Sequence, residues 1–164
     1  MQIKALALAA TILAALAAPV SAQIKDHVFK VGIGLNDDHP QALAVKYFAE
    51  QLSAKSGGKL VAKLYASGSL GNDVSMTSAL RGGTLEMTVP DTSTLMSLIK
   101  PFGVLNLPLT FNNEQEADAV LDGPFGQKLL AKLPEKGLVG LGYWENGFRH
   151  VTNSRRPIDR KSVV

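Results

Sequence analysis

The sequence predicts an α/β fold with an open sheet flanked by helices. Strand-like and helix-like patterns alternate along the chain, and a strand–helix–strand order fills about forty residues after residue 26, as in a parallel βαβ unit. The same order then repeats up to residue 90. In addition, 46% of the 164 residues are hydrophobic and cysteine is absent, which excludes a disordered chain and a disulfide-stapled mini-protein.

The first 22 residues are typical of a cleaved secretory signal and are set aside from the fold. Lys4 gives a basic start, residues 5–20 are apolar, and residues 20–22 place small side chains where a signal peptidase cuts. The alternative is a membrane anchor, but this apolar run would span only about 24 Å as a helix, less than the ~30 Å hydrocarbon core. We therefore expect cleavage after Ala22 and a periplasmic protein.

The first strand is predicted over residues 27–35, where alternate side chains favour opposite faces. Capping side chains and a proline at residues 36–40 then predict the start of a helix, which ends at the glycine pair 57–58. Its buried face is expected to carry Ala42, Val45, Ala49 and Leu52. Residues 59–65 predict the second strand, which completes one βαβ unit.

The pattern repeats after a turn at residues 66–72. Asn72 is the expected cap of a second helix, which ends at the glycine pair 82–83. The inward face of this helix is predicted to carry Met76, Ala79 and Leu80. Leu85, Met87 and Val89 alternate within a third strand predicted over residues 84–89.

The remaining elements are shorter. They comprise a helix from the cap-like cluster 91–94 to Lys100, an apolar loop at 101–111, a helix capped by Asn112 or Asn113, a helix starting at 123–124, and a fourth strand at 138–144. Ligands of open α/β sheets bind beyond the carboxyl ends of the strands. The loops of interest are therefore 35–40, 66–72, 90–94 and 144–149.

Signatures of catalysis, metal binding and nucleotide binding are missing. The three histidines are far apart in the sequence, no serine lies in a GxSxG elbow, and the glycines at 32–34 are not followed by the third glycine of a dinucleotide loop. We therefore expect no catalytic residues, no metal and no cofactor. Asp37 and Asp38 favour a helix start over an acid–base pair, but an enzyme using them with His39 stays an alternative.

The segment 144–149 concentrates side chains suited to recognition. Arg149 can clamp a carboxylate through two parallel hydrogen bonds, although a surface arginine that is solvated or paired with Glu145 is the alternative. Trp144 is equally compatible with a core role and with a cleft. The basic run at 155–161 is short and lacks aromatic residues, so we expect a solvated tail and no nucleic-acid binding.

Several segments, in the same order, resemble the periplasmic solute-binding proteins of TRAP transporters, tripartite ATP-independent importers of organic acids, of the C4-dicarboxylate-binding DctP type. The matching segments are residues 65–71 (YASGSLG), 80–87 (LRGGTLEM), 107–111 (LPLTF), 121–126 (LDGPFG), and 142–149 (GYWENGFR) followed by 152–157 (TNSRRP). The resemblance covers roughly residues 29–158.

The resemblance implies the first lobe of a two-lobed receptor with the periplasmic-binding-protein fold. Such a receptor closes on a small carboxylate, of the dicarboxylate or sugar-acid class, and delivers it to membrane subunits driven by an ion gradient. Arg149 matches the first of two family arginines that approach the ligand. By the same alignment the ligand-binding residues are Arg149, Asn146, Trp144, Asp91, Ser93 and His39.

The chain departs from the family pattern after residue 158, where the family continues with a strand carrying the principal arginine and with the second lobe. We expect residues 23–158 to form the N-terminal lobe and 159–164 to be a non-family tail, which favours a truncated or frameshifted product. A single lobe supplies only part of the ligand contacts, so weak or undetectable binding by this chain alone is expected. Besides the enzyme, the alternatives are an ABC-type receptor and a sensory binding module.

Overall fold

The computed structural model describes residues 24–148 and 154. The expected signal peptide at 1–22, the candidate Arg149 and the expected tail at 159–164 lie outside the described residues. In chain order the described elements are β1 (His27–Gly32), α2 (Pro40–Lys55), β2 (Leu60–Tyr65), α3 (Asp73–Arg81), β3 (Met87–Thr88), α4 (Thr92–Leu95), η1 (Lys100–Asn106), α5 (Glu114–Leu121), α6 (Pro124–Leu130) and η2 (Leu133–Lys136), the two η elements being 3₁₀ helices.

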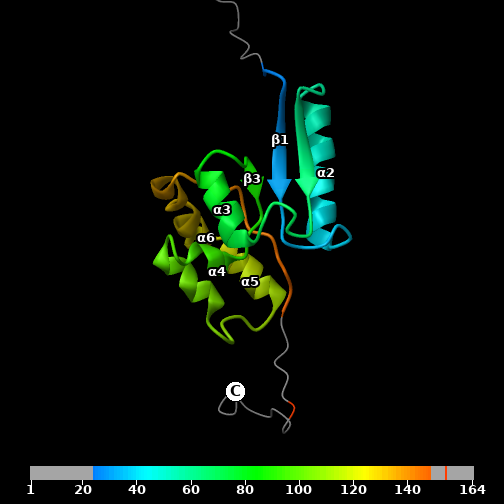
Figure 1. Ribbon diagram of the computed structural model, residues 1–164. Helices are drawn as coiled ribbons and strands as arrows, with labels where there is room; N and C mark the ends of the chain where they lie inside the picture. Colours follow the sequence, from blue (N-terminus) through cyan, green and yellow to red (C-terminus); the bar gives the residue numbers. More distant parts are fainter. Residues whose placement is uncertain (1–23, 149–153, 155–164) are drawn as a thin grey trace, which may run out of the picture.

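A parallel sheet in the order β2–β1–β3 confirms the predicted α/β class and both βαβ units (Figure 1). β1 pairs with β2 along its whole length, from His27 opposite Leu60 to Gly32 opposite Tyr65. β3 pairs with β1 over two residues only, Met87 and Thr88. The connection after β1 leads to β2 on one side of it, and the connection after β2 crosses over to β3 on the other side. The topological switch point of the sheet therefore lies between β1 and β3.

The first hydrophobic core joins α2 to one face of the sheet. Its buried side chains are Val31, Ile33, Ala42, Val45 and Ala62, and Phe29, Ala49 and Leu52 pack around them. This is the helix face that the sequence predicts. On the opposite face of β1, α3 packs only against the carboxyl end of the strand, where a Cβ added to Gly32 would lie 2.6 Å from Met76 Sδ. Farther back on the same face Val28 is 54% exposed, so the described helices cover this face only in part.

A second hydrophobic core holds the shorter helices together beyond β3. Its buried side chains are Ile99, Phe102, Leu129, Leu133 and Leu138. Figure 1 shows α4, α5 and α6 gathered on the β3 side of the sheet, away from α2. None of the helices in the described part of the chain combines the length and apolar character needed to cross a membrane.

The predicted fourth strand at 138–144 is wrong. Leu138 is buried, but Val139 and Leu141 are 78% and 75% exposed, and the segment forms no strand among the described residues. An alternating pattern specifies which side chains face inward, whereas a strand also needs a neighbour for its backbone hydrogen bonds. The third strand is likewise shorter than predicted, with two paired residues in place of 84–89, although Leu85 is buried as expected.

Candidate functional site

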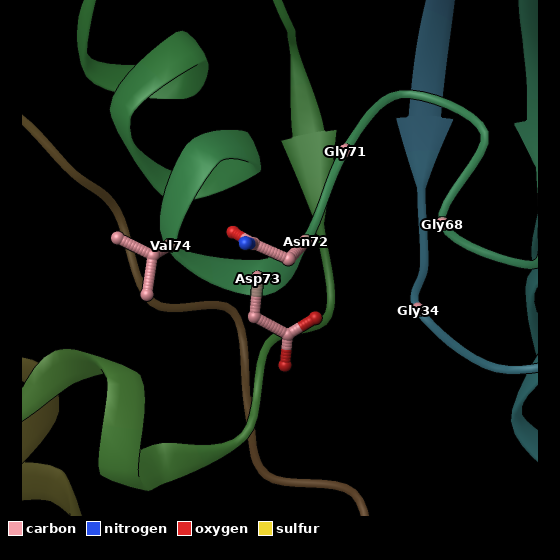
Figure 2. Close-up of a pocket in the computed structure, with 6 residues that line it drawn as sticks. All are labelled: Gly34, Gly68, Gly71, Asn72, Asp73 and Val74. Atoms are coloured by element: carbon pink, nitrogen blue, oxygen red, sulfur yellow. The ribbon is translucent and has the colours of Figure 1, made fainter.

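Two adjoining hollows lie at the carboxyl ends of β1 and β2. The first has a volume of about 640 Å³ and is lined by Gly34, Gly68, Gly71, Asn72, Asp73 and Val74 (Figure 2). The second has a volume of about 410 Å³ and is lined by Gly34, Leu35, Asn36, Asp38, His39 and Pro40. Gly34 contributes to both, so the hollows are neighbours at the edge of the sheet where ligands of α/β folds bind.

Hydrogen bonds hold the first two loops against each other. The Ser67 amide donates to the Leu35 carbonyl at 2.7 Å, and the Gly68 amide donates to the Ile33 carbonyl at 3.0 Å. Gly68 has a positive φ of 63°, a conformation that glycine adopts without strain. The loop after β2 is thereby fixed beside the loop after β1.

The third loop, which follows β3, is joined to the first turn of α3. The Asp91 amide donates to Asp73 Oδ2 at 3.0 Å. The Asp91 carboxylate in turn accepts from the Ser93 amide at 2.8 Å and caps α4. Asp73 therefore connects the wall of the first hollow to the loop that carries two of the predicted site residues.

The fourth loop is joined to the first turn of α2. Gln41 is buried, and its Nε2 donates to the Glu145 carbonyl at 3.2 Å. Upstream, the Tyr143 hydroxyl donates to the Gly126 carbonyl at 3.0 Å, and partial burial raises the pKa of this hydroxyl. These two bonds fix the start of the segment that carries Trp144 and Asn146. All four loops that the sequence singles out are therefore linked at one edge of the sheet.

The carboxylate of Asp73 lines the first hollow, and the sequence did not single it out. Figure 2 shows its side chain projecting from the start of α3 toward the space between that helix and the Gly34 segment. A Cβ added to Gly34 would lie 3.0 Å from Asp73 Oδ1, so the glycine allows this oxygen to approach the chain after β1 closely. In the sequence Asp73 only extends the capping signal of Asn72. The sequence signal that could have identified Asp73 is its position directly after the glycine-rich turn that follows a predicted strand.

The predicted site residues are only partly brought together. His39 lines the second hollow, where its Nδ1 also accepts from the Gln41 amide at 3.2 Å and caps α2. Asp91 and Ser93 lie on the joined third loop without lining either hollow. Trp144, which is 41% exposed, and Asn146 do not line them either. Arg149 lies outside the described residues.

The acidic groups near the site differ in their environments. Asp37 forms an ion pair with Lys46, with 2.8 Å between Oδ2 and Nζ, and lines neither hollow. The neighbouring Asp38 lines the second hollow. On the fourth loop, partial desolvation and the nearby Glu114 and Asp118 raise the pKa of Glu145. Within the described ranges, no group of three histidine, cysteine or acidic side chains is arranged to hold a metal ion.

The chain matches the model of a protein family described as bacterial extracellular solute-binding protein, family 7 (DctP), over residues 31–161. It is 36% identical to the 2,3-diketo-L-gulonate-binding periplasmic protein of Escherichia coli, covering 91% of this chain and 45% of the relative. It is 35% identical to the C4-dicarboxylate-binding protein of Bacillus subtilis, covering 80% and 37% respectively.

Solved structures agree with the family match. The sugar acid binding protein of Advenella mimigardefordensis, in complex with galactonate, is 50% identical and superimposes with a TM-score of 0.78 over 82% of this chain and 44% of that one. The chain thus spans less than half the length of these relatives. The parallel sheet, the loops gathered at its carboxyl edge and the family match agree: the chain belongs to family 7 of the bacterial extracellular solute-binding proteins, the DctP family.

Proposed function

We propose that the chain acts as the N-terminal lobe of an extracytoplasmic receptor for a small organic acid, feeding a TRAP-type ion-driven importer. The observation that carries this proposal is the linkage of four loops at the carboxyl edge of the sheet, the first two of which line adjoining hollows, in a chain of a solute-binding family. The relatives named above bind 2,3-diketo-L-gulonate, C4-dicarboxylates and galactonate. The ligand class is therefore that of sugar acids and dicarboxylates.

The lobe supplies polar groups from several loops. We assign ligand contacts to His39 from the loop after β1 and to Trp144 and Asn146 from the fourth loop. Asp91 and Ser93 position the third loop, and Arg149 is proposed as the carboxylate clamp, since guanidinium and carboxylate form two parallel hydrogen bonds. In a two-lobed receptor, contacts from both lobes favour the closed state, and this lobe contributes one share of them.

We infer that the ligand is bound and released unchanged. Asp37 is ion-paired with Lys46, and His39 Nδ1 accepts a helix-capping hydrogen bond, so both have structural roles that need no reaction. A secreted enzyme using these residues is the second candidate, favoured only by the place of Asp38 and His39 in one hollow. The variant His39→Ala distinguishes the receptor from the enzyme. In a receptor the variant binds the ligand more weakly and no product forms with or without the substitution. In an enzyme the wild type forms product and the variant does not.

Export and membrane partners belong to the same proposal. The Escherichia coli relative is described as periplasmic, which supports periplasmic placement of this chain. Amino-terminal sequencing of the protein recovered from the periplasm should start at Gln23, because cleavage is expected after Ala22. Recovery of the uncleaved chain in the membrane fraction would contradict this placement.

The binding test uses Trp144, the only tryptophan of the sequence. Galactonate and succinate are titrated into the chain while tryptophan emission is recorded, with galactitol as the matched ligand that has hydroxyls but no carboxylate. We expect saturable changes with an organic acid, with a dissociation constant of about 1 mM or weaker, because a single lobe buries the ligand only partly. No saturable change with either acid, or an equal response to galactitol, would contradict the proposal.

A further inference from the structure

Asn146 and Gly147, on the fourth loop, form the only Asn–Gly pair of the sequence. Both residues are exposed and lie outside every helix and strand of the described chain. In such a pair the amide carbon of asparagine is within reach of the next backbone nitrogen, and glycine has no Cβ to obstruct the approach. The pair is therefore a candidate for spontaneous loss of the side-chain amide.

The conformation around Gly147 leaves room for this reaction. Its φ of 72° is one that glycine adopts without strain, and a Cβ built on it would meet no atom within 4 Å. The Gly147 amide donates to the exposed carboxylate of Glu145 and to no backbone carbonyl among the described residues. In that part of the chain, no helix or strand hydrogen bond has to break before this nitrogen turns toward the Asn146 side chain.

The other asparagines of the described chain are held differently. They are exposed as well, so exposure does not set Asn146 apart. Each takes part in a side-chain hydrogen bond, in which the oxygens of Asn36, Asn72 and Asn113 accept and the amides of Asn106 and Asn112 donate. Each is also followed by a residue that has a Cβ. Asn146 alone has neither restraint within the described residues.

The reaction needs only water and hydroxide, and nothing is oxidised or reduced. The Gly147 nitrogen gives its proton to hydroxide and forms a bond to Asn146 Cγ. The bond from Cγ to the side-chain nitrogen breaks, and this nitrogen takes a proton from water and leaves as ammonia. The product is a cyclic succinimide. Water then opens the ring at either carbonyl, which leaves aspartate or isoaspartate at position 146.

We propose that Asn146 is a site of spontaneous deamidation and that the reaction weakens organic-acid binding. The modification follows from the loop itself, whereas its effect on binding rests on the proposed receptor function. The new carboxylate stands on the loop assigned to ligand contacts, where it repels the carboxylate of an organic acid. Isoaspartate also lengthens the backbone by a carbon atom, which displaces the side chains beside it.

Peptide mapping by mass spectrometry measures the modification without any ligand. The purified chain is kept at mildly alkaline pH, and the peptides that contain Asn146 and Asn36 are followed over time. Asn36 is the matched internal control, since it is exposed but bonded to Ser67 and followed by Asp37. We expect deamidation at Asn146 to be at least about tenfold faster than at Asn36, with isoaspartate among the products.

Two variants test the mechanism, and circular dichroism checks that each is folded. Gly147→Ala places a Cβ beside the attacking nitrogen and should slow the reaction about tenfold. Asn146→Gln needs a larger ring and should stay intact over the same period. Deamidation at Asn36 as fast as at Asn146, or an unchanged rate in Gly147→Ala, would overturn the proposed site. If Gly147→Ala does not fold, the comparison of Asn146 with Asn36 decides.

Titration with galactonate, followed by the emission of Trp144, measures the effect on binding. The deamidated chain should bind about tenfold more weakly than the fresh chain, and Asn146→Asp, which introduces the same charge, should also weaken binding. Equal affinity of the fresh and the deamidated chain would overturn the effect on binding while the receptor function stands. If galactonate does not bind the fresh chain, the proposed function and the effect on binding fail together, and the peptide map still decides the modification.

Discussion

Gly126, in the first turn of α6, packs directly against the last residue of α5, and replacing it by alanine should destabilise the fold. It is buried, and a Cβ built on it would lie 2.8 Å from Leu121 Cα and closer still to the Leu121 carbonyl. Because these are backbone atoms, no side-chain rotation relieves the clash. Overpacking of this kind costs about 3 kcal/mol, and alanine regains about 1 kcal/mol through its helix propensity. The expected net loss is about 2 kcal/mol, or roughly 4–8 °C in Tm.

Urea denaturation followed by circular dichroism measures this loss. The matched control is Gly142→Ala, since Gly142 is exposed and an added Cβ would meet no atom within 4 Å. The control should stay within about 0.5 kcal/mol of the wild type. Because the Gly126 carbonyl accepts the Tyr143 hydroxyl, Gly126→Ala should also shift the emission of Trp144 in the folded protein. A Gly126→Ala chain as stable as the control would refute the reasoning.

Three other predictions follow from individual contacts. Tyr143→Phe removes the hydrogen bond to the Gly126 carbonyl and should cost about 1 kcal/mol in urea denaturation; an unchanged midpoint would contradict that bond. Burial raises the pKa of Tyr143, so this tyrosine ionises at a lower pH in the unfolded chain than in the folded one. The stability that the group contributes is present below pH about 10 and should be lost as the pH rises further. The urea midpoint of the wild type should fall across that range for this reason, and Tyr143→Phe should lack this part of the fall. Asn113 caps α5, since its Oδ1 accepts the Glu116 amide at 2.8 Å, and Asn113→Ala should lower the free energy of unfolding by about 1 kcal/mol. A smaller loss of stability than in Asn112→Ala would contradict the assignment of Asn113 as the cap.

The first βαβ unit could be predicted from the sequence because its signals are local. Alternation around Val31 and Ile33 and helical spacing from Ala42 to Val45 identify the faces that meet in the first core. Asn113 as the cap of α5 was one of two alternatives, and both asparagines contact Glu116: the side chain of Asn113 accepts its amide, and Asn112 donates to its carboxylate, which lowers the pKa of Glu116.

The parts that could not be predicted depend on distant partners. Residues 138–144 alternate like a strand, but pairing needs a neighbour that a local pattern cannot specify. Asp73 looks like an ordinary residue at a helix start, and only the fold brings it beside Gly34 and the Asp91 amide. The loops of the site were predictable from the rule for parallel sheets, since the strand order β2–β1–β3 places the change of direction between β1 and β3.

Amide chemical-shift mapping with galactonate tests the central claim, that the carboxyl edge of the sheet is an organic-acid site, most directly. A ¹H–¹⁵N spectrum of the chain is recorded at increasing ligand concentration, with galactitol as the control. The account predicts saturable shifts concentrated at Gly34, Gly68, Asp73 and Glu145, with α5 and α6 unchanged. Shifts concentrated on α5 and α6, or equal shifts with galactitol, would contradict it.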